Sequence, residues 1–299
     1  MKPRIAITVG DPAGIGPEIA AKAANDARVR DLCEPVLYGP PDGEAFPPGH
    51  LSAAAGRAAF DAIVEAVRDA QAGRVQGIAT APVNKLAFAH AGLPWKGHTD
   101  LLGALTGSTQ VAMMFWSEPL KVVLATVHIP LAEVPAALDR ARLDAIVALT
   151  AQALPRFGIA SPRIALAGLN PHAGEDGLLG TEEQEVLAPA VAAARARGVT
   201  IDGPFPGDTV FVRAARGEFD VVIACYHDQG LIPVKLLAFG RAVNVTLGLP
   251  IIRTSVDHGT AFDIAGKGIA DPSSMVEATL LAARLACGVP PSHEGGAAS

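Results

Sequence analysis

Three histidines follow short apolar runs at separate places in the chain. His128 comes after "VVLATV", His172 lies just beyond "RIALAGL", and His227 follows "VVIACY". Such runs are typical of buried strands, and ligands of open α/β sheets gather at the carboxyl ends of strands. A hydrogen bond within a loop is the commoner role of a single histidine. Three in equivalent positions instead favour one divalent ion with coordination positions left open for a substrate.

Polar and basic residues accompany these histidines. Asp228 can orient the imidazole of His227 or assist a proton transfer, and it can equally cap a turn that Gly230 closes. Lys235 lies five residues further on, and Arg253 follows the strand-like "GLPII". Both can bind an anionic substrate, Arg253 with two parallel hydrogen bonds. We therefore regard them as candidate anion-binding residues.

Two further segments could bind anions. "GHTD" at 97–100 precedes the helical "LLGAL", so His98 and Thr99 could hold an anion at a helix N-terminus. Capping by Thr99 or Asp100 explains the same residues and is compatible with that role. Lys85 follows another strand. "VGDPAGIGPE" at 9–18 lacks the spacing of the dinucleotide-binding fingerprint, and a tight turn before a helix explains its glycines.

The elements that must position these residues alternate between strand and helix, as in βαβ units. Strands are expected at 5–9, 36–38, 77–80, 110–116, 121–127, 163–167, 221–225 and 243–246. Helices are expected at 17–31, 57–72 and 134–157, from about 181, and at 273–287. "SEPL" joins two successive strands as a hairpin. The sequence therefore predicts an α/β fold with a mixed sheet.

The composition limits the class of function. Half of the 299 residues are hydrophobic, 18% are charged and the net charge is −6, which does not favour nucleic-acid binding. Cys33, Cys225 and Cys287 lie too far apart for a CxxC pair, which fits a reducing cytoplasm. No run is long enough to span a membrane. We expect a soluble, cytoplasmic protein whose partners are small molecules and other protein chains.

Six motifs together identify a family. In chain order they are "GDPAGIGPE", "GHTD", "VHIPL", "GLNPHAGE", "YHDQGLIPVK" and "NVTLGLPIIRTSVDHGTAFDIAGKG". They resemble the 4-hydroxythreonine-4-phosphate dehydrogenase family of the pyridoxal phosphate pathway. The resemblance implies a three-layer α/β/α fold like that of isocitrate and isopropylmalate dehydrogenases, with two intertwined subdomains. It also implies a homodimer with its active site at the subunit interface, and nicotinamide binding without a Rossmann fingerprint.

The resemblance also assigns subdomains and residues. Residues 1–103 with 250–290 would form the first subdomain, 104–249 the second, with the metal ligands and dimer contacts, and 291–299 a disordered tail. The family's metal ligands fall on His128, His172 and His227. Its substrate-binding residues fall on His98, Thr99, Lys235, Asn244 and Arg253. The implied cofactors are a divalent metal (Zn, Mg or Co) and NAD or NADP; the nucleotide-contacting residues are not identified.

The expected reaction is oxidation of 4-phosphooxy-L-threonine to 2-amino-3-oxo-4-phosphooxybutanoate, which decarboxylates to 3-amino-2-oxopropyl phosphate. Asp228 and Lys85 are candidate bases. A related dehydrogenase for threonate or erythronate 4-phosphate, or for a carboxylated cyclohexadiene dihydrodiol, is the alternative. Two other classes stay open: an acyltransferase that binds phosphate, and a non-catalytic protein with a closed metal site.

Overall fold

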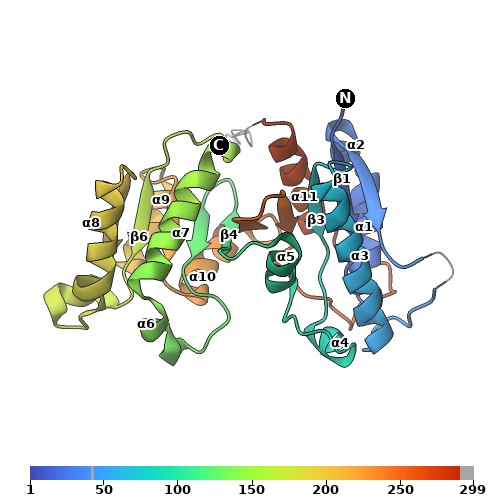
Figure 1. The fold of residues 1–299 in the computed structure, drawn as a ribbon, viewed down its shortest axis with the longest axis horizontal. Helices are drawn as coiled ribbons and strands as arrows, with labels where there is room; N and C mark the ends of the chain where they lie inside the picture. The colour runs from blue at the N-terminus through green and yellow to red at the C-terminus, as the bar shows by residue number, and fades with distance from the viewer. Residues whose placement is uncertain (42–43, 290–299) are drawn as a thin grey trace. The chain divides into compact units, whose positions relative to one another are not determined.

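The computed structural model describes residues 1–41 and 44–289, so the tail expected at 291–299 lies outside the described residues. The chain folds as two compact units. Unit 1 comprises Met1–Thr109 and Val243–Val289, and unit 2 contains Gln110–Ala242. Each unit holds its own layered arrangement of strands and helices (Figure 1).

Unit 1 is built on strands in the order β2 (Glu34–Tyr38), β1 (Arg4–Thr8), β3 (Gly77–Thr80), β10 (Arg253–Ser255) and β9 (Val243–Leu247). They run parallel except β9, which pairs antiparallel with β10. The helices of this unit are α1 (Gly16–Asn25), α2 (Ala27–Leu32), α3 (Ala53–Gln71), α4 (Lys85–His90), α5 (His98–Thr106) and α11 (Ser273–Ala286).

Helices cover both faces of the unit 1 strands. The buried helix α11 packs on β1, β3, β9 and β10, and the Thr254 hydroxyl donates to the carbonyl of Ala278 at 2.8 Å. Helix α3 packs on β1, β2 and β3. Since side chains alternate along a strand, Arg253 and Ser255 point away from α11. These two polar side chains therefore lie on the face opposite to α11.

Unit 2 has strands in the order β4 (Ala112–Trp116), β5 (Lys121–Leu124), β8 (Val221–Ala224), β6 (Ile164–Ala167) and β7 (Ile201–Phe205). Only the β4–β5 pair is antiparallel among them. Its α-helices are α6 (Val134–Ala137), α7 (Arg140–Ala153), α8 (Ala188–Ala196), α9 (Gly207–Ala215) and α10 (His227–Ala238). Short helical turns are η1 (Leu131–Glu133), η2 (Leu154–Phe157), η3 (Pro171–Gly177) and the π-helical η4 (Glu183–Leu187).

The core of unit 2 joins its strands to two helices. Val222 and Ala224 of β8 pack with Val122 of β5 and with apolar residues of α9 and α10. Full burial of each larger aliphatic side chain contributes about 1.5–3 kcal/mol, so this cluster fixes both helices. Helices α7 and α8 pack against each other (Figure 1). Among the described residues, no helix combines the length and the apolar composition needed to cross a bilayer.

The predicted mixed α/β architecture is confirmed, including the β4–β5 hairpin. The helices expected at 17–31 and 134–157 are wrong in one respect, because each is interrupted. Asp26 ends α1 and caps α2, with its carboxylate accepting from the Arg28 N–H at 2.8 Å. Asp139 likewise caps α7 by accepting from the Arg142 N–H at 2.7 Å. An aspartate that bonds a following N–H starts a new helix instead of continuing the old one.

Gly56 allows α3 to approach α4 closely. A Cβ at this position would lie 2.2 Å from the carbonyl oxygen of Ala87. Alanine is the better helix former by about 1 kcal/mol. Overpacking costs about 1–3 kcal/mol, and the atom that the new methyl group would meet belongs to the backbone of Ala87, which cannot change rotamer as a side chain can. We expect Gly56→Ala to lower the free energy of unfolding in urea by about 1 kcal/mol, with exposed Asp61→Ala within about 0.5 kcal/mol of wild type. Equal stability of Gly56→Ala and wild type would contradict this.

Candidate functional site

The segment "YHDQGLIPVK" is largely helical. His227 is the first residue of α10, directly after β8, and Pro233 lies inside this helix. Gly230 does not close a turn, as one alternative supposed. Instead it faces β5, where a Cβ would lie 2.6 Å from Cδ2 of Leu124 and 2.8 Å from Cγ1 of Val122. The glycine therefore lets the N-terminus of α10, with its histidine, lie close against the strands.

Two of the three predicted metal ligands lie together. The ring centroids of His128 and His227 are 5.5 Å apart with an interplanar angle of 43°. Asp228 bonds the same cluster, since its Oδ1 lies 2.7 Å from Nδ1 of His227. A carboxylate in this position fixes the orientation of an imidazole, which leaves Nε2 as the nitrogen available to a ligand.

His172 lies on an unusual turn after β6. Residues 172–176 all have positive φ, between 43° and 84°. A left-handed turn costs L-residues roughly 1–2 kcal/mol each, so other contacts must hold it. Glu183 supplies them, because its Oε1 accepts from the backbone N–H groups of Leu169 and Asn170 at 2.8 and 2.7 Å. Its Oε2 accepts from the Asn170 amide at 2.9 Å.

Glu183 has a role in the structure that its sequence context does not reveal. "TEEQ" is typical of a helix start, and nothing in these letters distinguishes a buried glutamate from its exposed neighbours. In the structure Glu183 is buried and joins η4 to the turn that carries His172. The same turn contacts α9 and β7.

The expected meeting of three imidazoles within one chain is not observed. In residues 1–41 and 44–289, no group of three or more histidine, cysteine, aspartate or glutamate side chains is close enough to hold a metal ion. His172 lies on the turn after β6, which contacts η4, α9 and β7, and His128 and His227 follow β5 and β8. The ring contact that the structure shows among these three histidines is the one between His128 and His227.

Lys235 lies on α10, two turns after His227. It is exposed and lines a cavity of about 440 Å³ together with His227, Asp228, Leu231, Ile232, Leu236 and Phe239. The cavity joins the polar start of the helix to an apolar stripe.

The remaining predicted substrate residues belong to unit 1. His98 and Thr99 begin α5, and Gly97 precedes them as the N-cap residue. Lys85 begins α4, where Asn84 caps the helix by accepting from the Leu86 and Ala87 N–H groups. The Lys85 side chain reaches this turn, since its Cε lies 3.9 Å from the position of a Cβ on Gly97.

Arg253 is the most deeply buried of these residues. Only 2% of it is exposed, and it is the first residue of β10 instead of following a strand at 248–252, which corrects the expectation for "GLPII". Its Nη1 donates to the Thr246 hydroxyl at 2.9 Å and its Nη2 to the Thr80 hydroxyl at 2.8 Å. Burial lowers the pKa of Arg253 to about 9, so the guanidinium remains charged at neutral pH.

Three buried polar atoms in this region have no hydrogen-bond partner among the described residues. They are Nε of Arg253, Nε2 of His98 and Oδ1 of Asn244. Burial, and then the charge of Arg253, lower the pKa of His98 well below its usual value, so its imidazole is neutral. Asn244 is paired with Ser255 across β9 and β10. Since buried polar groups normally find partners, these atoms indicate a site for a polar ligand.

The turn "VGDPAGIGPE" is explained by packing. A Cβ at Gly16 would lie 1.9 Å from the carbonyl oxygen of Val9. Asp11 is buried within the turn and accepts from the Ala13 N–H at 2.9 Å, and burial raises the pKa of its carboxyl. The tight turn expected here is confirmed.

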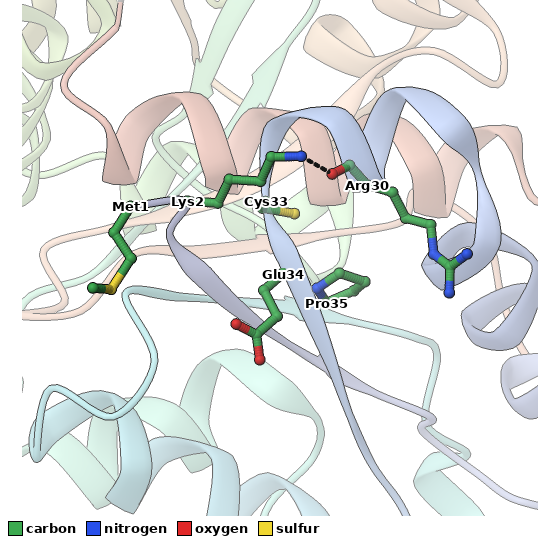
Figure 2. A pocket seen from close by; sticks show the side chains of 6 residues that line it. All are labelled: Met1, Lys2, Arg30, Cys33, Glu34 and Pro35. Carbon is green, nitrogen blue, oxygen red and sulfur yellow. Dashed lines mark hydrogen bonds between the residues drawn. The ribbon is translucent and has the colours of Figure 1, made fainter.

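A second cavity, of about 470 Å³, lies at the N-terminus and contains none of the predicted site residues. Figure 2 shows its lining, in which Lys2 donates to the carbonyl of Arg30 at 2.5 Å. Burial raises the pKa of the neighbouring Cys33 thiol to about 11, so this cysteine is unreactive at neutral pH.

Comparison with known proteins identifies the family. The sequence profile of the family described as "Pyridoxal phosphate biosynthetic protein PdxA" matches residues 14–282. The chain is 45% identical to a 4-hydroxythreonine-4-phosphate dehydrogenase of Desulforapulum autotrophicum, over 94% of this chain and 95% of that protein. It is 44% identical to a D-threonate 4-phosphate dehydrogenase of Cupriavidus necator, over 95% and 97% of the two chains.

Solved structures agree with this assignment. The crystal structure of 4-hydroxythreonine-4-phosphate dehydrogenase from Klebsiella pneumoniae matches with a TM-score of 0.87 and 43% identity, covering 96% of this chain and 98% of that one. Isocitrate dehydrogenase from Methylococcus capsulatus matches with a TM-score of 0.53 and 18% identity, over 97% and 87% of the two chains. The expected isocitrate dehydrogenase-like fold is thereby confirmed. The chain is a dehydrogenase and belongs to the PdxA family of pyridoxal phosphate biosynthetic proteins.

Proposed function

We propose that the protein oxidises 4-phosphooxy-L-threonine with NAD or NADP. The observation that carries this proposal is the buried guanidinium of Arg253, which has no carboxylate within ion-pair distance among the described residues. A buried, uncompensated charge is costly, and an anionic substrate would supply the missing counter-charge. The family assignment favours this dehydrogenase chemistry over acyl transfer to phosphate or a closed, non-catalytic metal site.

The chain's own residues would bind and orient the substrate. Arg253 would pair with one anionic end, and the neutral His98 and the Asn244 amide would bond polar groups beside it. Thr99 would contact a further polar group, and the family pattern makes Lys235 of unit 2 a candidate anion-binding residue. Fixing both ends of a short substrate selects which hydrogen faces the nicotinamide. These roles follow the family pattern and the buried polar atoms of unit 1.

In the proposed reaction, the secondary alcohol loses hydride from its carbon to the nicotinamide and its proton to a base. Asp228 and Lys85 are the candidates for that base. The product, 2-amino-3-oxo-4-phosphooxybutanoate, is a β-keto acid. Its carboxylate leaves as CO2 because the ketone accepts the electron pair, and protonation of the carbon gives 3-amino-2-oxopropyl phosphate.

Among the described residues, one chain places two of the three imidazoles together and does not by itself form a three-imidazole group. A metal such as Zn, Mg or Co stays part of the proposal in a form that requires a second subunit. In a homodimer with its active site at the interface, a further imidazole can come from the partner. This arrangement reconciles the family's three histidines with the pair found in one chain.

The second candidate is oxidation of D-threonate 4-phosphate. The relative from Cupriavidus necator with this name is 44% identical to the chain, about as similar as the relative named for 4-hydroxythreonine 4-phosphate. The two substrates differ at carbon 2, where one carries an ammonium and the other a hydroxyl. Arg253 would serve both, because both substrates carry anionic groups.

A substrate panel tests the proposal. We would measure reduction of NAD and of NADP with 4-phosphooxy-L-threonine, threonate 4-phosphate, erythronate 4-phosphate and a carboxylated dihydrodiol. The highest kcat/KM is expected for 4-phosphooxy-L-threonine. A clear preference for a sugar-acid phosphate would replace the first candidate by the second, and turnover of the dihydrodiol alone would exclude both.

The proposed homodimer has a candidate contact surface on α10. Ile232, Leu236 and Phe239 are 59%, 80% and 80% exposed. Ile232 and Leu236, four residues apart, lie on one side of the helix, and Phe239 follows its last residue. Leu231, Val234 and Ala238 are buried on the other side. A helix that is apolar on both sides is normally covered on both. This exposed stripe also lines the cavity that contains His227, so a dimer formed here would adjoin the site.

A charge within that stripe should dissociate the dimer. We expect Leu236→Glu and Phe239→Glu to sediment as monomers at micromolar concentration, where the wild type sediments as a dimer, because a buried unpaired carboxylate is strongly disfavoured. Val212→Glu, on the exposed side of α9, is the matched control and should remain dimeric. If Leu236→Glu and Phe239→Glu both remain dimeric, the subunit interface lies elsewhere on the protein.

A further inference from the structure

We propose that Thr80 and Thr246 are positioning residues that hold the guanidinium of Arg253 in the orientation that binds the substrate's oxyanion. The inference rests on the proposed role of Arg253 in binding substrate. It extends the site from the residues that would touch the ligand to two buried hydroxyls that act through one of them.

The geometry defines a cradle, by which we mean Thr80, Thr246 and Ser255 around Arg253. Thr246 lies opposite Arg253 on β9, and Thr80 lies on β3 at the other side of β10. Each hydroxyl accepts from a different terminal nitrogen, at 2.8 Å for Thr80 and 2.9 Å for Thr246. Both threonines and Arg253 are buried. The guanidinium of Arg253 is therefore held by one hydrogen bond at each of its two terminal nitrogens.

A chain of hydrogen bonds fixes the direction in which the Thr80 hydroxyl accepts. Thr80 Oγ1 donates to Ser255 Oγ at 2.9 Å, and Ser255 Oγ donates to the carbonyl oxygen of Thr80 at 3.1 Å. With its only hydrogen used in this way, Thr80 Oγ1 can serve Arg253 as an acceptor alone. The strands β3 and β10 thus present a lone pair to Nη2 and leave Nε of Arg253 with no partner among the described residues.

The chemistry of the acceptors matters as much as their positions. A carboxylate beside Arg253 would neutralise it and would compete with an incoming anion. A hydroxyl orients an N–H without supplying negative charge. Two threonines therefore keep the guanidinium aligned and its positive charge available, which a site for a carboxylate or a phosphate group requires. A purely structural arginine would gain more from an acidic partner.

Single substitutions test the cradle. In Thr80→Val and Thr246→Val the shape is nearly kept while the acceptor is lost. We expect KM for the substrate, and the concentration of inorganic phosphate that halves activity, to rise about 10-fold or more, as loss of a hydrogen bond to a charged group predicts. Since binding and not the chemical step is affected, kcat should change less. Thr80→Ser and Thr246→Ser, which keep the hydroxyl, should restore both values to within about 3-fold of wild type.

Thr254→Val is the matched control. Thr254 lies on the same strand and is equally buried, but its hydroxyl donates to Ala278 on the opposite face. Its loss should lower stability without changing KM or phosphate affinity. If Thr80→Val and Thr246→Val match Thr254→Val in both measurements, the cradle has no role in binding and the proposal is wrong.

Two further outcomes keep the proposal separate from the proposed function. If the wild type oxidises none of the panel, the function fails, while binding of inorganic phosphate by calorimetry still tests the cradle. If Thr246→Val does not fold, the double variant Thr246→Val/Arg253→Met should fold, since it removes the buried guanidinium that lost its acceptor. Failure of the double variant as well would mean that Thr246 acts through packing alone and would overturn the proposal.

Discussion

Arg253→Met is expected to lower kcat/KM by about 100-fold or more, while the protein becomes no less stable than the wild type. Truncating one partner of a buried, hydrogen-bonded charge pair costs about 2–5 kcal/mol of binding, and here the partner is the substrate. Replacing a buried charge by an apolar side chain of similar size is often neutral or stabilising by about 1–4 kcal/mol. Steady-state kinetics and urea denaturation of the same variant measure the two effects together.

The combination of lost activity and retained stability distinguishes a binding role from a structural one. Arg216→Met, at an exposed arginine after α9, is the control and should leave kcat/KM unchanged within about 2-fold, since surface substitutions usually stay within ±0.5 kcal/mol. If Arg253→Met unfolds the protein, Arg253 is needed mainly for folding and its assignment to the substrate fails. Full activity of a stable Arg253→Met would equally exclude the assignment.

The deep burial of Arg253 shows where sequence reasoning reaches its limit. The apolar "GLPII" was wrongly interpreted as a strand, because β10 begins at Arg253 itself. The acceptors of Arg253 were not predictable, because Thr80 lies 173 residues earlier in the chain and meets Arg253 only through the pairing of β3 with β10. Threonine in a strand is ordinary, so no local pattern distinguishes these hydroxyls from others.

The segment after β8 shows a different limit. Gly230 and Pro233 both disfavour a helix interior, and the letters suggested a polar turn after a strand. In the structure α10 forms because tertiary packing outweighs propensity: Gly230 permits close contact with β5, and Leu231 and Val234 are buried. The proximity of the His227 imidazole and the Asp228 carboxylate was predictable, since the two residues are adjacent in the chain in any conformation. Their helical setting was not.

The turn that carries His172 was the least predictable feature of the site. "GLNPHAGE" suggested a loop, but left-handed backbone at five successive residues has no reliable sequence signature beyond glycine. It persists because a buried carboxylate, Glu183, bonds the segment just before it. Strained backbone of this kind tends to occur at functional sites. His172 therefore keeps its place among the candidate residues although one chain does not bring it to the other two histidines.

Removal of a divalent metal is expected to abolish turnover if the predicted ion belongs to the active enzyme. Dialysis against a chelator should lower activity by more than the roughly 10–100-fold that loss of an outer-shell partner costs, and one of Zn, Mg or Co should restore it. His172→Ala and His227→Ala should each reduce the metal bound per subunit, measured by elemental analysis after dialysis. His90→Ala, at an exposed histidine in α4, should bind as much metal as the wild type.

The His172 variant is the decisive member of this set, because His128 and His227 already lie together in one chain. If the site needs a third imidazole from a partner subunit, His172→Ala and the monomeric Phe239→Glu should lose metal to a similar extent, although their substitutions lie on different segments of unit 2. Unchanged metal content in His172→Ala would remove that histidine from the ligand set. Full metal content in a monomeric Phe239→Glu would show that a single chain completes the site, and the shared arrangement would then have to be abandoned.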